Sequence, residues 1–319
     1  MLLGVGSIEI LLLLIAGIAL DRLFGEPRCL HPLVGFGRFA AWIEGALNRA
    51  PAARRSRLGG SLALILAVIP ATALAVWLTS NHFTPPLVWG VHALALYAAL
   101  GARSLRDHLA PIAAALEQQR LGEARILTAR IVTRDTAALD QAGVARAAVE
   151  SALENGNDAV FGTLFWFILL GAPGAVLFRL ANTLDAMWGY RNARFNYFGW
   201  AAARFDDLLN LVPARLTAVT YALLGSTANA FACWRSQAAA WSSPNAGPVM
   251  AAGAGALNVA LGGAAIYEGV TESRPPLGNG VAPGADHIVR ALRLVDAGIV
   301  LWVGVVALIA LISWVARHA

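Results

Sequence analysis

Carboxylate and amide side chains gather near residue 155, at the end of a predicted helix. Glu150 and Glu154 are four residues apart and therefore share one helix face. Asn155, Asn157 and Asp158 follow directly, just before an apolar segment. Mg²⁺ prefers oxygen ligands and keeps several waters, so Glu154 and Asp158 could hold it. A solvated helix end followed by turn residues is the alternative interpretation.

A second acidic pair, Asp206–Asp207, begins another apolar segment. Adjacent carboxylates could bind a metal or accept a proton from a reacting group. The alternative is an interfacial helix in which Arg204 balances their charge. The carboxylates that we take as catalytic candidates are Glu150, Glu154, Asp158 and Asp207.

Arginine is the residue that would bind anions in this chain. All 24 Lys and Arg residues are arginines, and the guanidinium group binds phosphate and carboxylate bidentately. The candidates for phosphate binding are Arg130, Arg134, Arg191 and Arg194. For a single arginine, anchoring of a cytoplasmic loop is the alternative role. The chain has no Walker A loop and no G-x-G-x-x-G motif, so a P-loop cannot bind ATP here.

The segment 182–215 is dense in Asn, Asp, Arg and aromatic residues, although apolar segments flank it on both sides. Hydrophobic spans alone do not require such residues. We expect a site that holds a large polar ligand at a membrane surface. No basic run interleaved with aromatic residues occurs elsewhere, so we expect no nucleic-acid partner.

The elements that position these residues belong to a membrane protein. The chain is 58% hydrophobic and 13% charged, with a mean hydropathy of +0.62, whereas soluble domains carry about 25% charged residues. A span needs about 20 apolar residues. Apolar windows lie at 2–20, 60–79, 86–101, 160–181, 208–231 and 295–315. Gly171 to Gly174 interrupts the fourth window, which predicts a kinked or re-entrant segment.

The arginines also predict the orientation in the membrane. Residues 21–57 and 102–159 hold seven arginines each, whereas 80–85 holds none. Loops rich in Arg face the cytoplasm. We therefore expect a multi-pass protein of the cell (inner) membrane, with its site on the cytoplasmic side.

The predicted fold is all-α: a single membrane-embedded domain over 1–319 with about four to six transmembrane or re-entrant helices. Residues 104–159 are predicted to form a cytoplasmic helical insert. Gly122 would separate its first two helices, and a third would run from about Leu139 to Glu154. Segments 182–207 and 242–290 are predicted as polar loops that form the site. No alternating pattern typical of β-strands is present.

The polar segments described above belong to longer stretches in which the chain resembles the CobD/CbiB family of cobalamin-biosynthesis membrane proteins, the adenosylcobinamide-phosphate synthases. The stretches that carry the resemblance run in order along nearly the whole chain. They are DRLFGEP-x₃-HPLVGFGR (21–38), ARIVTRDT (129–136), GVARAAVESALEN (143–155), LFWFILLGAPGAVLFRLANTLDAMWGYRN (164–192), YFGWAAARFDDLLNLVPARLTA (197–218), SPNAG (243–247), LGGAAIYEG (261–269) and RPPLG (274–278).

The resemblance implies ATP-dependent amide formation. The propionate carboxylate of adenosylcobyric acid would be activated and then attacked by aminopropanol phosphate or ethanolamine phosphate, giving adenosylcobinamide phosphate. ATP would be the co-substrate and Mg²⁺ the metal. The implied partners are the corrinoid, the amino-alcohol phosphate and the lipid bilayer. A homodimer, or a complex with later enzymes of the pathway, is compatible with this interpretation.

On this interpretation Glu150, Glu154 and Asp158 would hold Mg²⁺–nucleotide, or one of them would act as the base. The residues expected to bind substrate or phosphate are Arg130, Arg134, Asn155, Asn182, Asp185, Tyr190, Arg191, Asn192, Arg194, Trp200 and Asn245. One departure lies after the SPNAG stretch, where the family often has Trp-Pro-Glu and this chain has Pro248, Val249 and Met250. We therefore assign no catalytic acid to that loop.

Two other classes of protein remain open. A related family of membrane proteins, linked to β-lactamase regulation, would bind a ligand or partner without catalysis. A corrinoid transporter with broken helices is the third class, although the chain shows no internal repeat. ATP consumption that depends on corrinoid would separate an enzyme from both.

Overall fold

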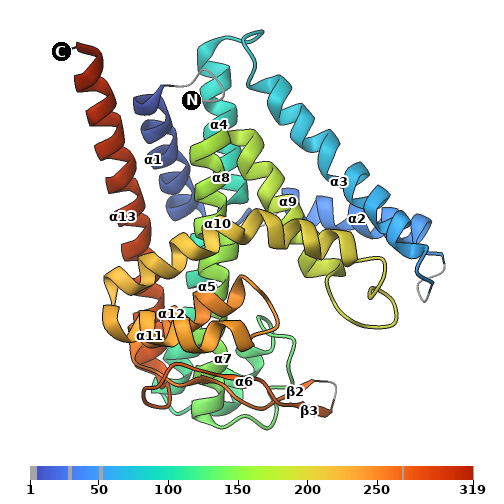
Figure 1. The fold of residues 1–319 in the computed structure, drawn as a ribbon, viewed down its shortest axis with the longest axis vertical. Coiled ribbons are helices and arrows are strands. Elements are labelled where there is room, and N and C mark those ends of the chain that lie inside the picture. The colour runs from blue at the N-terminus through green and yellow to red at the C-terminus, as the bar shows by residue number, and fades with distance from the viewer. Residues whose placement is uncertain (1–5, 28–30, 50–52, 268, 319) are drawn as a thin grey trace. The chain divides into compact units, whose positions relative to one another are not determined.

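A computed structural model describes residues 6–27, 31–49, 53–267 and 269–318. The described residues are mostly helical, as predicted (Figure 1). The chain divides into two compact units. Unit 1 consists of Met1–Gly101, Gly162–Asn210 and Val305–Ala319, and unit 2 consists of Ala102–Phe161 and Leu211–Gly304.

Unit 1 is built from apolar helices. They are α1 (Ser7–Phe24), α2 (Pro32–Leu47), α3 (Ser56–Leu78), α4 (Pro85–Ala99), α8 (Gly162–Leu170), α9 (Ala172–Trp188), the first part of α10 (Trp200–Leu224) and the last part of α13 (Ala285–His318). Helix α9 packs against α3, α4 and α8. Large side chains such as Leu184, Trp188 and Phe198 fill the core between α9 and its neighbours, where they are almost fully buried.

The break between α8 and α9 confirms that the fourth apolar window is interrupted. Gly171 has a φ of +64°, a conformation that glycine adopts without strain. The next residue, Ala172, donates its backbone N–H to Nδ1 of His92, at 2.9 Å. A Cβ at Gly171 would collide with the His92 ring. Both the turn and its packing therefore require glycine.

Unit 2 contains the predicted helical insert. The helices of this insert are α5 (Ala102–Glu117), α6 (Leu121–Thr128) and α7 (Gln141–Asn155). The π-helical segment η1 (Gly156–Phe161) follows them. The prediction that Gly122 separates the first two helices is wrong, because Gly122 lies inside α6. The chain turns at Gln119 instead, which has a φ of +58°. The side chain of Asp140 caps α7 by accepting the backbone N–H of Gly143, at 2.7 Å.

The segment 242–290 differs from the predicted polar loop. It contains α12 (Ala246–Leu257), which is buried from Gly247 onward and packs against α7 and α11 (Thr227–Gln237). Four short strands follow, which the sequence did not predict. Strand β1 (Leu261–Gly262) pairs antiparallel with β4 (Pro276–Leu277), and β2 (Ala265–Tyr267) pairs antiparallel with β3 (Val270–Glu272). A 3₁₀ turn, η2 (Ala238–Ala240), precedes α12. Segment 182–207 is likewise mostly helical, since only 189–199 joins α9 to α10.

Three of the described helical stretches are long and apolar enough to cross a membrane. They are Ser56–Leu78, Pro85–Glu117 and Ala285–His318. Only 22%, 33% and 17% of their most apolar windows is buried, so these helices present broad apolar surfaces. Such surfaces mark contact with lipid or with another protein. The structure therefore agrees with an all-α membrane protein.

Candidate functional site

A polar cavity of about 530 Å³ lies in unit 2. This volume falls within the range of small-ligand sites. Its walls come from 131–134, from one face of α7, from 240–242 before α12, and from the strand region 267–275. Of the predicted site residues, the cavity brings together Arg134, Glu150, Glu154 and Asn155.

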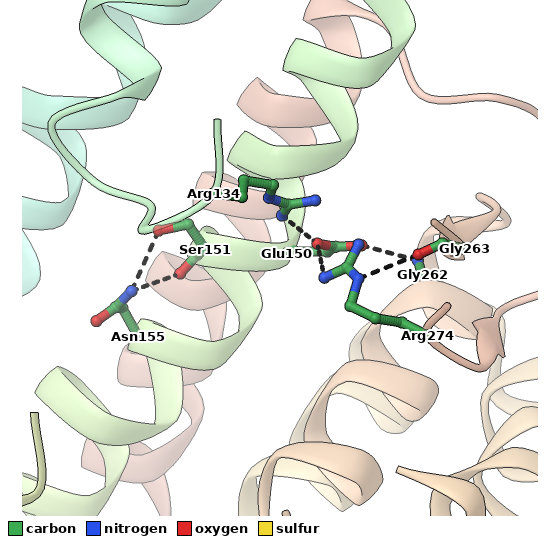
Figure 2. Close-up of polar contacts among 7 residues, drawn as sticks. All are labelled: Arg134, Glu150, Ser151, Asn155, Gly262, Gly263 and Arg274. Carbon is green, nitrogen blue, oxygen red and sulfur yellow. Dashed lines mark hydrogen bonds and ion pairs between the residues drawn. The ribbon is translucent and has the colours of Figure 1, made fainter. Parts of the chain in front are cut away.

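Glu150 lies at the centre of an ion-pair cluster in this cavity. Figure 2 shows Arg134 and Arg274 converging on its carboxylate. The Oε2 atom accepts from Nη2 of Arg134 and, at 3.1 Å, from Nη1 of Arg274. The Oε1 atom accepts from the backbone N–H of Gly262 at 2.7 Å and from Nη2 of Arg274 at 3.3 Å. A carboxylate has about four acceptor positions, and these four contacts occupy them.

Long-range contacts create this cluster. Helix α7 supplies Glu150, the 129–140 connection supplies Arg134, and the chain between β3 and β4 supplies Arg274. The hairpin of β2 and β3 is tied to the same connection, because the backbone N–H of Asp135 donates to the carbonyl of Ile266 at 2.8 Å. The guanidinium of Arg274 also lies over the ring of Trp241, 5.6 Å from its centroid. Sequence reasoning did not single out Arg274 or Trp241, although Arg274 begins the RPPLG stretch.

The next turn of α7 adds further polar groups to the cavity wall. Glu154 lines the cavity, one turn after Glu150. The amide of Asn155 donates to the carbonyl of Ser151 at 3.0 Å and to its hydroxyl at 3.2 Å (Figure 2). Glu272 and Tyr267 add polar groups to the lining from the strand region. Among the described residues, the cavity lining thus combines two arginines with three carboxylates.

Asp158 lies in the π-helical segment and does not line this cavity. Its carboxylate accepts from the amide of Asn157, at 2.8 Å. The carbonyl oxygen of that amide accepts from the hydroxyl of Thr217, at 3.0 Å. π-Helical turns are frequent at functional sites, so Asp158 stays a prediction for the site.

Two other predicted residues of unit 2 also lie outside the cavity lining. Arg130 is exposed. Asn245 is buried before α12, where its side-chain oxygen accepts from Arg215. Arg215 also donates to the carbonyl of Pro244, at 3.0 Å. Asn245 therefore helps to hold the turn of the SPNAG stretch.

Unit 1 holds a second polar cluster, between α9 and α10. Asp206 accepts from the amides of Asn182 at 3.3 Å and Asn210 at 3.0 Å. Burial, followed by the negative charge of Asp207, raises the pKa of Asp185 from 3.8 to about 6. Burial also raises the pKa of Asp207, although Arg204 and Arg191 act in the opposite direction. Asp185 and Asp207 can therefore exchange protons closer to neutral pH than an exposed aspartate can.

The connection between α9 and α10 carries the remaining predicted residues. The side chain of Asn192 accepts the backbone N–H groups of Arg194 at 3.1 Å and Phe195 at 2.9 Å. Arg194 donates from Nε to the buried Glu44 of α2, at 3.1 Å. Tyr190, Arg191 and Trp200 are exposed, and the ring of Trp200 lies 5.2 Å from the guanidinium of Arg57. Asn192 and Arg194 thus shape this loop by their own contacts.

No group of three or more His, Cys, Asp or Glu side chains arranged to hold a metal occurs among the described residues. Mg²⁺ often binds through only one or two carboxylates plus substrate phosphates. Of the two predicted ligands, Glu154 lines the cavity and Asp158 does not. The predicted metal ligands stay a prediction.

Comparison with known proteins identifies the family. The family described as "CobD/Cbib protein" matches residues 14–295. The Cobalamin biosynthesis protein CobD of Stutzerimonas stutzeri (strain A1501) is 60% identical over 294 residues, which cover 92% of this chain and 96% of that protein. The protein of the same description from Chromobacterium violaceum is 55% identical over 287 residues, covering 89% and 91%.

More distant relatives extend the similarity. The Cobalamin biosynthesis protein CobD of Mycobacterium tuberculosis (strain ATCC 25618 / H37Rv) is 40% identical over 292 residues, covering 88% of this chain and 91% of that protein. No solved structure is significantly similar to this chain. The family match and these relatives cover most of the sequence, including every segment that lines the cavity of unit 2. This chain therefore belongs to the CobD/CbiB family.

Proposed function

We propose that this protein is a membrane enzyme of cobalamin biosynthesis that forms an amide bond at the expense of ATP. It would join aminopropanol phosphate, or ethanolamine phosphate, to the propionate carboxylate of adenosylcobyric acid. The observation that carries the proposal is the family match over residues 14–295, together with relatives described as cobalamin biosynthesis proteins. The polar cavity of unit 2, with its paired arginines, supports it.

The chemistry requires activation of the carboxylate. The carboxylate oxygen attacks the γ-phosphorus of ATP, which releases ADP and leaves an acyl phosphate. The neutral amine then attacks the acyl carbon, the amine loses a proton, and inorganic phosphate departs. Mg²⁺, when bound with the nucleotide, neutralises phosphoryl charge. The chain would supply arginines for the phosphoryl oxygens and a carboxylate for the proton.

The two polar clusters suggest how the chain divides these tasks. Arginines such as Arg134 and Arg191 would bind phosphate groups of the substrates. Glu154, Asp158 and Asp207 are the candidates for proton acceptance or for Mg²⁺–nucleotide binding. The amide and aromatic side chains of 182–200 would contact the corrinoid, which is fringed with amides and has flat faces. The protein would act in the cell membrane, with its site facing the cytoplasm, where ATP is available. It would work as a monomer, as a homodimer or in a complex with later enzymes of the pathway.

A reconstituted assay with mass-spectrometric detection tests the proposal. Purified protein in nanodiscs is combined with adenosylcobyric acid, aminopropanol phosphate and Mg-ATP, and each component is omitted in turn. We expect the amide product only when all components are present. Saturable corrinoid binding without product would instead support a binding protein, and corrinoid flux into proteoliposomes would support a transporter.

Three substitutions test the assignment of residues. Glu154→Gln, Asp158→Asn and Arg191→Ala each remove one charge. The first two keep the size of the side chain, and the third changes a side chain that is exposed. We expect loss of activity with retained folding. Full activity in all three variants would refute these roles.

A further inference from the structure

Two arginines in the cavity of unit 2 share a single carboxylate. Arg134, Arg274 and Glu150 have side chains that are only 8%, 14% and 4% exposed. The cluster therefore places two positive charges against one negative charge, away from water. A buried charge without an opposite charge is costly, so a bound anion would complete this cluster.

Both arginines keep N–H groups for such an anion. A guanidinium has five N–H groups. Within the described part of the chain, Arg134 donates to Glu150 alone, from Nη2. Arg274 donates from Nε to the carbonyl of Gly263, at 3.1 Å, and from its two terminal nitrogens to Glu150. Each terminal nitrogen has a second N–H, and both arginines line the cavity. Paired guanidinium donors are suited to phosphate oxygens.

The rest of the cavity favours a positive group on the same ligand. Glu154 lies one turn of α7 beyond Glu150, about 6 Å along the helix axis. Glu272 lines the same cavity, with the rings of Trp241 and Tyr267. Carboxylates and aromatic faces both attract a primary ammonium. A separation of about one helical turn suits a short ligand that carries the two charges on neighbouring groups.

We propose that this cavity binds a short primary amine that carries a phosphate monoester, with the phosphate on Arg134 and Arg274. The inference rests on the proposed function, whose amino-alcohol phosphate has this chemistry, and it assigns that substrate to a particular cavity. A nucleoside triphosphate fits the cavity less well, because it carries more negative charge than Arg134 and Arg274 can neutralise.

Direct binding tests the inference without the reaction. The full chain in detergent is titrated calorimetrically with ethanolamine phosphate in the absence of corrinoid and ATP. Ethyl phosphate, ethanolamine and Mg-ATP are titrated in parallel. We expect saturable binding of ethanolamine phosphate, weaker binding of ethyl phosphate, and no measurable binding of ethanolamine.

Substitution by lysine locates the phosphate. Arg134→Lys and Arg274→Lys retain the charge that balances Glu150 but lose the paired donors. We expect each variant to bind ethanolamine phosphate roughly tenfold to hundredfold more weakly, with unchanged affinity for Mg-ATP. Arg120→Lys is the matched control, since Arg120 pairs with Glu123 on the exposed surface of unit 2, and its affinity should equal that of the unmodified chain.

Several results would overturn the inference. Absence of ethanolamine phosphate binding to the unmodified chain would do so, as would equal binding of ethyl phosphate, or unchanged affinity in both lysine variants. Weaker binding of Mg-ATP alone in those variants would assign the arginines to the nucleotide instead. Because no product is measured, binding without amide formation would uphold this site while refuting the proposed reaction.

Discussion

Replacement of Glu150 tests the cluster at the centre of the cavity. The Glu150→Ala variant leaves two guanidinium groups, on Arg134 and Arg274, without their shared carboxylate, and it leaves the backbone N–H of Gly262 without its acceptor. The side chains of Glu150, Arg134 and Arg274 are buried or nearly buried. Removing one partner from a buried ion pair costs about 3–5 kcal/mol. We expect the free energy of unfolding to fall by about that amount.

A matched exposed pair provides the control. Arg120 and Glu123 form an ion pair whose side chains are 50% and 44% exposed. Exposed pairs contribute less than about 1 kcal/mol, so Glu123→Ala should change stability little. Glu150→Gln keeps an acceptor oxygen and should lie between the two variants. The contrast isolates burial, because all three changes remove a glutamate charge from unit 2.

These differences in stability can be measured by unfolding the protein in detergent micelles. A denaturing detergent is titrated in, and far-ultraviolet circular dichroism reports the loss of helix. The buffer should contain no phosphate or sulfate, since an anion could replace the missing carboxylate. If Glu150→Ala were no more destabilising than Glu123→Ala, the cluster would not be the buried ion-pair site that the structure shows.

Three further predictions concern stability. Gly171→Ala should lower the free energy of unfolding by about 1–3 kcal/mol, because Gly171 has a positive φ and lies against the His92 ring. Gly90→Ala in α4 is the control: the added Cβ would contact no neighbouring atom, so stability should rise by up to about 1 kcal/mol. Chemical denaturation compares the two variants. Folding raises the pKa of Asp185 from 3.8 to about 6, so between these pH values the folded protein holds a proton that the unfolded chain has lost. The free energy of unfolding should therefore fall by up to about 3 kcal/mol as the pH rises from about 4 to about 6. Unfolding curves of the Asp185→Asn variant should lack this fall. Tyr221→Phe removes the hydroxyl that donates to the carbonyl of Leu153 at 3.1 Å. We expect the free energy of unfolding to fall by about 1 kcal/mol, which should appear as a lower thermal midpoint. An unchanged midpoint would refute the role of this hydrogen bond.

Most helices could be predicted from the sequence because their signals are local. The clean apolar windows at 60–79 and 295–315 became α3 and the second half of α13. Glycine and proline after Leu170 marked a true helix break. The resemblance to the family was also carried by continuous stretches, and the family match confirms it.

Helix α12 shows where local signals fail. Its sequence, AGPVMAAGAGAL, has glycines that lower helix propensity. In the structure, however, a Cβ at Gly253 would collide with Leu153 of α7, and one at Gly255 would collide with the backbone of α11. The glycines therefore permit close packing of buried helices. This packing stabilises the helix against its own propensity, and it depends on partners that are distant in the sequence.

The candidate site was predictable only where its residues share one element. Glu150, Glu154 and Asn155 were found together because helical spacing places them near each other. The partner of Glu150, Arg274, lies 124 residues away. No periodicity links them, and the strands that position Arg274 are two or three residues long. Strands this short carry too few alternating residues to predict.

The contacts of Glu150 also change the order of the candidates for the base. Two guanidinium groups and a backbone N–H already occupy the acceptor positions of the Glu150 carboxylate, which leaves no open position for a reacting group. Asp207 differs, because burial raises its pKa in spite of two nearby arginines. A base near neutral pH needs a pKa raised in this direction. The geometry of Glu150 thus suits the holding of arginines, whereas the electrostatics of Asp207 suit proton transfer.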